Sequence, residues 1–245
     1  MNTHDIKLEN FAVMNLEGAI RGMRNPLRSW DKSDSGYSTA SAHSSYRRPL
    51  FEIGPNDLDL AQKLVKSGSD HRKFLRQIFV SMDITAPRYW WTEFDTYKVG
   101  TVANSESTMH TIHKRAFREE DFANNICEST GEFDDNHQQD YMDLCCSRDI
   151  VLDGLLDFLN DHRLAYLNLL KCKEYALAKC EWRTMIQFLP QSYLQMRTVT
   201  LDYETLLKIY WARKQHKLIE WHDFCDYLPK LPYFYELCIK PFEEE

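Results

Sequence analysis

The arrangement of apolar and polar positions predicts two strands and three helices in the first hundred residues. Residues 7–15 (KLENFAVMN) and 78–87 (IFVSMDITAP) have the pattern of strands, and the second ends at a proline. Elsewhere apolar residues recur at helical spacing. The predicted helices cover residues 16–30, with a stop near Pro26, residues 54–68 and residues 88–98, which Pro87 opens.

The helix predicted at residues 54–68 has clear signals at both ends. Asn56 or Asp57 is of the residue type that caps a helix start, and Gly68 is of the type that ends one. One face of this helix is apolar and consists of Leu58, Ala61, Leu64 and Val65. This face is expected to pack on the core.

Two segments have no regular pattern. Residues 33–50, rich in Ser, Asp and Gly, are predicted to form a flexible loop, which is either a linker or a lid that faces a ligand. Residues 114–148 are acidic and weakly periodic, and we expect an excursion between core elements. From residue 149 to residue 188 the pattern is strongly helical. We expect one domain over residues 1–245.

The last periodic stretch, residues 201–232, first suggests a single long helix. In such a helix Lys214 and Lys217 would fall in the middle of the apolar stripe, where two ammonium groups are costly to bury. A break within residues 213–217 (RKQHK) removes this conflict. The sequence therefore predicts two helices, with Arg213 at the end of the first.

Composition restricts the class of protein. The chain has 245 residues, of which 43% are hydrophobic and 13% aromatic, enough for a sizeable buried core. Its formal net charge of -7 argues against binding nucleic acid, which requires a cationic surface, but a small nucleotide remains possible. No basic leader and no apolar run of the ~20 residues that span a bilayer is present, so we expect a cytoplasmic protein that does not contact a membrane.

Motifs for metals and common catalytic sites are missing. The seven cysteines include no paired CxxC arrangement, so we expect reduced thiols and no zinc site. His110 and His113 could share a helical face but lack further ligands, and no metal is predicted. The sequence has no Gly-rich phosphate loop, Ser-centred elbow or HExxH motif. Any phosphate binding would come from scattered side chains and helix ends.

The order of these elements resembles that of the flavin-dependent thymidylate synthases (ThyX). His71 precedes the second strand, Pro87 precedes the motif helix, and the family's LP pair and its apolar helix ending in LR match Leu189–Pro190 and the helix ending at Arg213. The resemblance covers residues 50–110 and 185–228.

The spacing of the family's motifs agrees better than their residues do. The Arg-His-Arg signature corresponds to Thr96, Tyr97 and Lys98, and Asn104 and Ser107 match the Asn and Ser of the motif that follows. Other motif positions carry different residues in this chain. Glu93 occupies the position of the family's Gln, Ile186 that of an Arg, and Ser105, Met109 and His110 those of Glu, Arg and Tyr. Asp202, Tyr203 and Glu204 occupy the position of the family's N-x-R motif.

The resemblance implies an α+β fold, with an antiparallel sheet packed against long helices, and a homotetramer. It implies FAD as cofactor and methylation of deoxyuridylate (dUMP), with methylenetetrahydrofolate and NADPH as co-substrates. Arg213 would be catalytic and would hold the base. The resemblance assigns nucleotide binding to Glu93, Asn104, Ser107 and Arg213, and cofactor binding to His71, Tyr97, Lys98 and Asp202.

The changed motif residues leave other interpretations open. Guanidinium groups make paired bonds to phosphate that Lys cannot copy, and several have been lost. A non-catalytic nucleotide-binding or interaction protein with the same fold is one alternative, and an altered pyrimidine-nucleotide-modifying flavoenzyme is another. For single residues, Arg213 could satisfy helix carbonyls, Lys98 could be solvated, and Trp90 and Trp91 could belong to the core rather than stack on a flavin.

Overall fold

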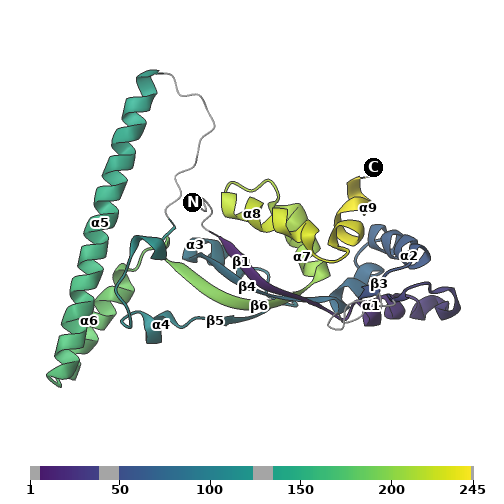
Figure 1. The fold of residues 1–245 in the computed structure, drawn as a ribbon, viewed down its shortest axis with the longest axis horizontal. Coiled ribbons are helices and arrows are strands. Elements are labelled where there is room, and N and C mark those ends of the chain that lie inside the picture. Colours follow the sequence, from purple (N-terminus) through teal and green to yellow (C-terminus); the bar gives the residue numbers. More distant parts are fainter. Residues whose placement is uncertain (1–5, 39–49, 124–134, 244–245) are drawn as a thin grey trace, which may run out of the picture. The chain divides into compact units, whose positions relative to one another are not determined.

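The computed structural model describes residues 6–38, 50–123 and 135–243, with the backbone alone for residues 135–145. Its main sheet has four strands in the order β1-β4-β6-β5 (Figure 1). These strands are β1 (Lys7–Met14), β4 (Phe79–Pro87), β5 (Val102–Ser105) and β6 (Leu194–Asp202). A second, two-stranded sheet pairs β2 (Gly36–Tyr37) with β3 (Phe51–Glu52).

Contacts at the strand ends show that β4 and β6 are antiparallel. The N–H of Tyr203, just after β6, donates to the carbonyl of Ile78, just before β4, at 3.0 Å. At the other end, the N–H of Arg88, just after β4, donates to the carbonyl of Tyr193, just before β6, at 3.1 Å. The end of each strand thus lies beside the start of the other.

The two outer strands are antiparallel to their neighbours as well. The side-chain amide of Asn15, just after β1, donates to the carbonyl of Gln77, before β4, at 2.9 Å. The N–H of Glu106, just after β5, donates to the carbonyl of Met196, near the start of β6, at 2.9 Å. The antiparallel sheet that the resemblance implied is therefore confirmed.

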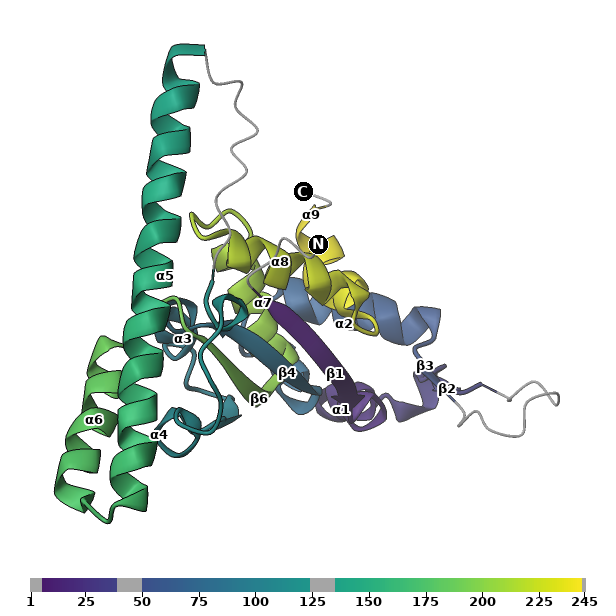
Figure 2. The ribbon, with the colours of Figure 1, turned by 60° about the vertical axis from the view of Figure 1, so that its left-hand side comes forward.

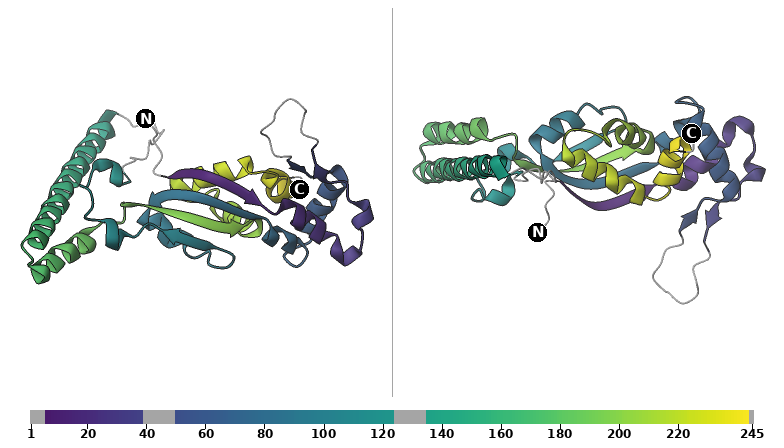
Figure 3. Two further views of the ribbon diagram at one scale, coloured as in Figure 1. Left: turned by 60° about the horizontal axis from the view of Figure 1, so that its bottom comes forward. Right: turned by 90° about the horizontal axis from the view of Figure 1, so that it is seen from above.

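Helices account for most of the remaining described chain (Figures 2 and 3). The α-helices are α1 (Leu16–Met23), α2 (Pro55–Lys66), α3 (Arg88–Phe94), α4 (Thr108–Thr111), α5 (Asp135–Lys171), α6 (Tyr175–Phe188), α7 (Tyr203–Arg213), α8 (Ile219–Tyr227) and α9 (Lys240–Glu243). A 3-10 helix, η3 (Arg72–Gln77), precedes β4. None of the described helices is both long and apolar enough to cross a membrane.

The described chain groups into two compact units. The first unit takes its residues from segments 8–84, 95–104 and 198–245, and the second mainly from segments 85–94 and 105–197. Each has its own buried side chains and is described by itself below.

The core of the first unit forms where one face of the sheet meets α7 and α8 (Figure 1). Alternate residues of β4 are fully or almost fully buried, namely Val80, Met82 and Ile84. Between them Asp83 accepts hydrogen bonds from Asn10 of β1 at 2.7 Å and from Thr198 of β6 at 2.6 Å. The period of two in β4 thus separates an apolar core face from a polar face, as its sequence predicted.

The predicted break between the two C-terminal helices is present. Helix α7 ends at Arg213, and α8 begins at Ile219. Lys214 follows the end of α7 and places its ammonium 3.8 Å from the ring centroid of Trp211, a cation–π contact. The break keeps this charge out of the apolar interior.

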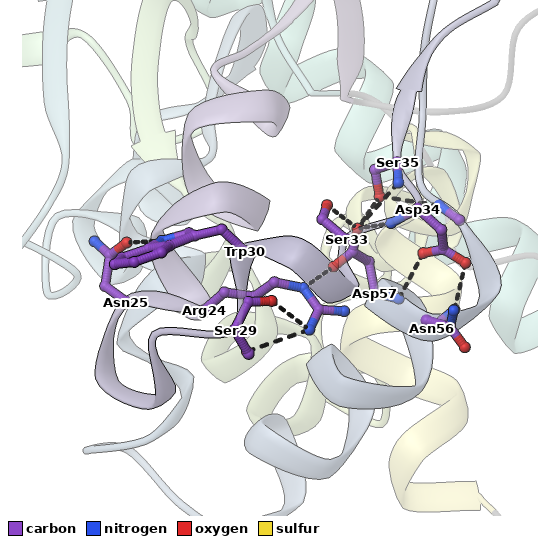
Figure 4. A network of polar contacts seen from close by, with 10 residues as sticks. Arg24, Asn25, Ser29, Trp30, Ser33, Asp34, Ser35, Asn56 and Asp57 are labelled. Atoms are coloured by element: carbon purple, nitrogen blue, oxygen red, sulfur yellow. Dashed lines mark hydrogen bonds and ion pairs between the residues drawn. The ribbon is translucent and has the colours of Figure 1, made fainter.

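Helix α2 starts differently from the prediction. Neither Asn56 nor Asp57 caps it; Gly54 is the N-cap residue and Pro55 is the first helical residue. The carboxylate of Asp34 accepts hydrogen bonds from the N–H groups of Asn56 at 2.9 Å and Asp57 at 3.0 Å (Figure 4). The prediction was wrong because a distant residue supplies the cap, which local spacing cannot show.

Asp57 is fully buried and fixes the start of the predicted 33–50 loop. Its carboxylate accepts hydrogen bonds from the hydroxyls of Ser33 at 2.7 Å and Ser35 at 2.6 Å, and it pairs with Arg24 (Figure 4). Residues 33–35 are therefore held by a buried carboxylate. Residues 39–49 of the predicted loop lie outside the described residues.

In the second unit, α5 and α6 form a helical hairpin. Its core consists of Ile112, Phe117, Phe122, Leu159, Met185, Leu189 and Tyr193. Helix α5 begins at Asp135, so residues 135–148 of the expected acidic excursion are helical, and its residues 124–134 lie outside the described residues. These residues contain no Gly or Pro to stop a helix, and polar residues alone do not prevent one.

The aromatic residues of α3 are core residues of the second unit. Trp90 and Trp91 have exposed fractions of 0% and 1%, and both rings contact Phe94. The indole N–H of Trp91 donates to the carbonyl of Gln195 at 2.9 Å. Such burial leaves no open ring face for a flavin, so the core interpretation of the two tryptophans is the one that fits.

Candidate nucleotide site

A pocket of about 330 Å³ in the first unit brings together three of the predicted cofactor-binding residues. Tyr97, Lys98 and Asp202 all line it. The other lining residues come from η3, from the loop before β5 and from the first two turns of α7: Arg76, Thr96, Val99, Glu204, Thr205 and Lys208. We call this the α7 pocket.

Asp202 connects the pocket to the start of α7. It is 5% exposed, and its Oδ1 accepts a hydrogen bond from the N–H of Thr205 at 2.8 Å, as an N-cap residue does. Burial raises the pKa of Asp202, although the bonds from Thr205 oppose the rise. Asp202 therefore has a structural role in capping α7 as well as a place in the pocket wall.

Gly100 allows the loop before β5 to lie against Asp202. Its φ is +76°, and a Cβ at this position would lie 2.2 Å from Oδ2 of Asp202. Only glycine combines that backbone conformation with so close an approach. The backbone near Tyr97 and Lys98 is thus held at the start of α7.

Glu204 is surrounded by cations and is 1% exposed. It pairs with the guanidinium of Arg76, with Arg72 at 3.5 Å and with Lys208 at 3.6 Å. Burial alone would raise the pKa of Glu204, but the bond from Arg76 and the neighbouring positive charges outweigh burial and lower it. Two of the pocket's three cations, Arg76 and Lys208, are therefore already paired with a carboxylate.

Lys98 is the remaining cation in the pocket wall. Its side chain is exposed, and it makes no hydrogen bond or ion pair with any other residue that the structure describes. Its ammonium is therefore available to a phosphate. The alternative that Lys98 is only solvated is equally consistent with its position.

Arg213 lies next to the α7 pocket through Tyr97. Its Nε donates to the hydroxyl of Tyr97 at 3.0 Å, and its guanidinium carbon lies 4.9 Å from the ring centroid of Trp221. The same carbon is 5.7 Å from the ring centroid of Tyr97. The two rings therefore hold the half-buried guanidinium in a defined orientation.

The other predicted residues do not line this pocket. His71 is exposed at the start of η3, and its N–H donates to the carbonyl of Gly68 at 3.1 Å. Asn104 lies on strand β5 with its side chain exposed, not in a turn. Ser107 caps α4 by accepting from the N–H of His110 at 3.3 Å, and Glu93 lies half-buried on α3; both belong to the second unit.

Arg72, Arg76 and Lys208 are residues around this pocket that the sequence did not predict. Arg72 and Arg76 lie on η3, after His71. Both contact Glu204, which is more than a hundred residues away in the sequence. No local motif connects these positions. At Glu204, where the resemblance leads one to expect an Arg, guanidinium groups from another element therefore flank the side chain.

The described residues also bear on metals and thiols. No group of three or more His, Cys, Asp or Glu side chains in the described part of the chain could hold a metal ion. The cysteines whose side chains are described are all free: Cys146, Cys172, Cys180, Cys225 and Cys238.

Comparison with known proteins defines the fold as that of the flavin-dependent thymidylate synthases. The ThyX of Helicobacter pylori, in a crystal structure complexed with FAD and dUMP, matches with a TM-score of 0.58 and 16% identity over 96% of this chain and 98% of that one. A second structure of that enzyme with FAD and dUMP matches with a TM-score of 0.56 and 16% identity over 98% and 99%. No protein-family model and no curated protein sequence matches the chain. The expected ThyX-like fold is therefore confirmed.

Proposed function

We propose that this protein is an FAD-dependent thymidylate synthase-like protein that binds a uridine nucleotide. The observation that carries the proposal is Arg213, which Tyr97 and Trp221 orient beside a pocket of nucleotide size within a fold shared with enzymes crystallised with FAD and dUMP. In this proposal Arg213 donates hydrogen bonds to the pyrimidine base and stabilises charge that develops on it. The active protein would methylate dUMP, with methylenetetrahydrofolate as carbon donor and NADPH as reductant.

The α7 pocket fits part of an FAD molecule. Its volume of about 330 Å³ is at the lower end of small-molecule sites and suits a nucleotide half of the cofactor. Lys98 would bind a phosphate, while Tyr97 and the backbone held at Gly100 would form the wall. When bound, the flavin supplies reducing equivalents. Burial of Asp202, which disfavours its charged form, reduces its repulsion of a nearby phosphate.

The other assignments belong to the same proposal. His71 would contact the cofactor, and Glu93, Asn104 and Ser107 would contact the nucleotide. Because the α7 pocket of one chain holds only part of a dinucleotide, we propose that a homo-oligomer, of four chains as the resemblance implies, completes the site.

A second candidate function is nucleotide binding or protein interaction without catalysis. Its support is Glu204, which pairs with guanidinium groups that could otherwise bind phosphate. A third candidate, an altered pyrimidine-nucleotide-modifying flavoenzyme, is compatible with the same residues. Both predict that dUMP is not methylated, and the nucleotide-binding form of the second candidate and the third candidate also predict that Arg213 and Lys98 bind a nucleotide.

The absorption spectrum of the purified protein tests flavin binding. Near-stoichiometric FAD, either co-purified or restored by incubation, is the expected result. A colourless protein that cannot be reconstituted with FAD would remove the enzyme proposal and leave the non-catalytic one.

Equilibrium binding of dUMP tests the role of Arg213. Loss of a hydrogen bond from a charged group costs about 1.5–3 kcal/mol, so Arg213→Ala should weaken dUMP binding by roughly 10- to 150-fold. Tyr97→Phe, which keeps the ring but removes the hydroxyl that accepts from Arg213, should have a smaller effect. Arg28→Ala, at an exposed arginine outside the pocket, is the control. Equal dUMP affinity in the wild type and Arg213→Ala would exclude Arg213 from the site.

A further inference from the structure

A second cavity of about 870 Å³ lies in the first unit and shares no lining residue with the α7 pocket. Its walls come from α1, from the segment after α1 up to β2, from β3 and from the start of β4. Residues 33–37, the start of the predicted loop, contribute Ser33, Ser35, Gly36 and Tyr37. We call it the α1 cavity, and its volume is within the range of small-molecule sites.

Four aromatic rings line the α1 cavity, and three of them are unusually exposed. Trp30, Tyr37 and Phe79 are 49%, 57% and 39% exposed, respectively. The fourth, Phe51, meets Tyr37 edge to face with ring centroids 5.5 Å apart. The exposed faces of these apolar rings are in contact with water inside the cavity. A flat ligand that covered them would remove this apolar surface from water.

Trp30 is held in place rather than free to turn. Its indole N–H donates to the side-chain oxygen of Asn25 at 2.9 Å, and Asn25 also lines the cavity (Figure 4). A ring fixed in advance loses little conformational freedom when a ligand stacks on it. Trp30 therefore has the properties of a stacking platform.

Arg24 supplies a buried donor to the same cavity. The side chain is only 4% exposed; its Nε pairs with Asp57, and its Nη1 donates to the carbonyl of Ser29 at 3.3 Å (Figure 4). The hydrogen bonds of the Arg24 guanidinium to described residues use Nε and Nη1, which leaves Nη2 without a partner in the described part of the chain, and Arg24 lines the cavity. The ion pair with Asp57 fixes the guanidinium, and Nη2 remains for a ligand acceptor.

The charges around the cavity balance. Asp57 compensates Arg24, and Glu17, which accepts a hydrogen bond from the Tyr37 hydroxyl at 2.8 Å, compensates the exposed Arg21. A ligand recognised mainly through negative charge would find no excess of cations here. The side-chain amides of Asn15, Asn25 and Gln77 add neutral polar groups to the wall.

We infer that the α1 cavity binds a planar nitrogen heterocycle of the nucleobase type that carries a ring carbonyl. The inference rests on the exposed aromatic rings, the Arg24 donor and the balance of charges in the cavity. The ring stacks on Trp30, and Nη2 of Arg24 donates to the carbonyl oxygen, with Arg21 as a second donor. The inference does not depend on the proposed function, because it uses none of the residues of the α7 pocket or Arg213.

Guanosine is the probe, with adenosine and inorganic phosphate for comparison. Guanosine carries a ring carbonyl where adenosine carries an amino group, and phosphate carries charge without a ring. Saturable guanosine binding, measured by equilibrium dialysis and by ligand-observed NMR, is expected to be tighter than adenosine binding. Phosphate should not compete. No saturable guanosine binding up to millimolar concentration, or competition by phosphate alone, would overturn the inference.

Variants of exposed residues locate the binding without threatening the fold. Stacking is worth about 1–3 kcal/mol per base, so Trp30→Ala should weaken guanosine binding by roughly 5- to 150-fold, while Trp30→Phe should retain most of it. Leu27→Ala is the matched control, because Leu27 is 65% exposed on the same segment but does not line the cavity. Guanosine binding that is unchanged in Trp30→Ala, or lost in Arg213→Ala, would place the ligand elsewhere and refute the inference.

Discussion

The Glu204→Gln substitution removes the carboxylate that pairs with Arg72, Arg76 and Lys208 while keeping the volume of the side chain. Glu204 is 1% exposed, so its loss leaves three positive groups next to a neutral amide. Breaking a buried ion pair costs about 3–5 kcal/mol. Because the side chains of Arg76 and Lys208 are each 54% exposed and water screens part of their charge, we expect a loss of about 2–4 kcal/mol in the free energy of unfolding.

The same substitution should strengthen anion binding in the α7 pocket. Arg76 and Lys208 line the pocket and would no longer be paired with a carboxylate. We expect inorganic pyrophosphate to bind about tenfold more tightly, which corresponds to about 1.4 kcal/mol. Stability and anion affinity thus change in opposite directions, which distinguishes this effect from general damage to the fold.

Urea unfolding at neutral pH and pyrophosphate titration by calorimetry measure the two effects. Glu52→Gln is the control, because it removes the same charge from an exposed position on β3. The lowered pKa of Glu204 means that wild-type Glu204 stabilises the fold above the ordinary pKa of a glutamate, and that this contribution is lost as the pH falls through the lowered value. The stability difference between wild type and variant should shrink accordingly. A variant as stable as Glu52→Gln, with unchanged pyrophosphate affinity, would refute the role assigned to Glu204.

Three further predictions concern other buried groups. Because burial raises the pKa of Asp202, Asp202→Asn, which can still cap α7, should gain stability relative to wild type as the pH rises from acid to neutral in urea unfolding. For Asp57, burial is outweighed by the hydrogen bonds that it accepts, and its pKa is lowered; Asp57→Asn should therefore cost about 3–5 kcal/mol at neutral pH, and this cost should fade as acid protonates the wild-type carboxyl. Burial raises the pKa of the Cys225 thiol to about 12, so mass spectrometry after native alkylation at pH 8 should find Cys225 unmodified and the exposed Cys172 modified.

Two features of the sequence allowed parts of the fold to be predicted: a strong period of apolar residues, and charged side chains whose burial would be too costly. Strand β4 showed its core face in alternate apolar residues, and the cost of burying Lys214 was enough to place the break between α7 and α8. Strand β5, in contrast, has four exposed residues and owes its pairing to its position beside β6. A pattern of burial cannot predict a strand that buries nothing. Strand β6 was not predicted either, because within Leu194–Asp202 only Val199, Leu201 and Asp202 are buried, which is too short a pattern to show the period of a strand.

The helix cap of α2 and the ion pairs of Glu204 could not be predicted, because their partners are distant in the sequence. The cap of α2 comes from Asp34, and the cations around Glu204 come from η3. Each pairing joins groups that are far apart in the sequence, so neither propensity nor motif spacing contains it. Asp57 appeared in the sequence as a capping residue, whereas its carboxylate is the buried centre of a loop.

The surroundings of Glu204 change how a carboxylate at this position should be interpreted. The resemblance assigns an Arg to this position, and a carboxylate there first suggests repulsion of phosphate. The structure surrounds that carboxylate with two Arg residues and a Lys, so the position is not a bare negative charge. The three cations and two carboxylates of the α7 pocket leave a formal excess of one positive charge, and burial of Asp202 raises its pKa. Phosphate affinity here therefore depends on how firmly Glu204 retains Arg76, and a ligand that competes for that guanidinium must overcome a buried ion pair.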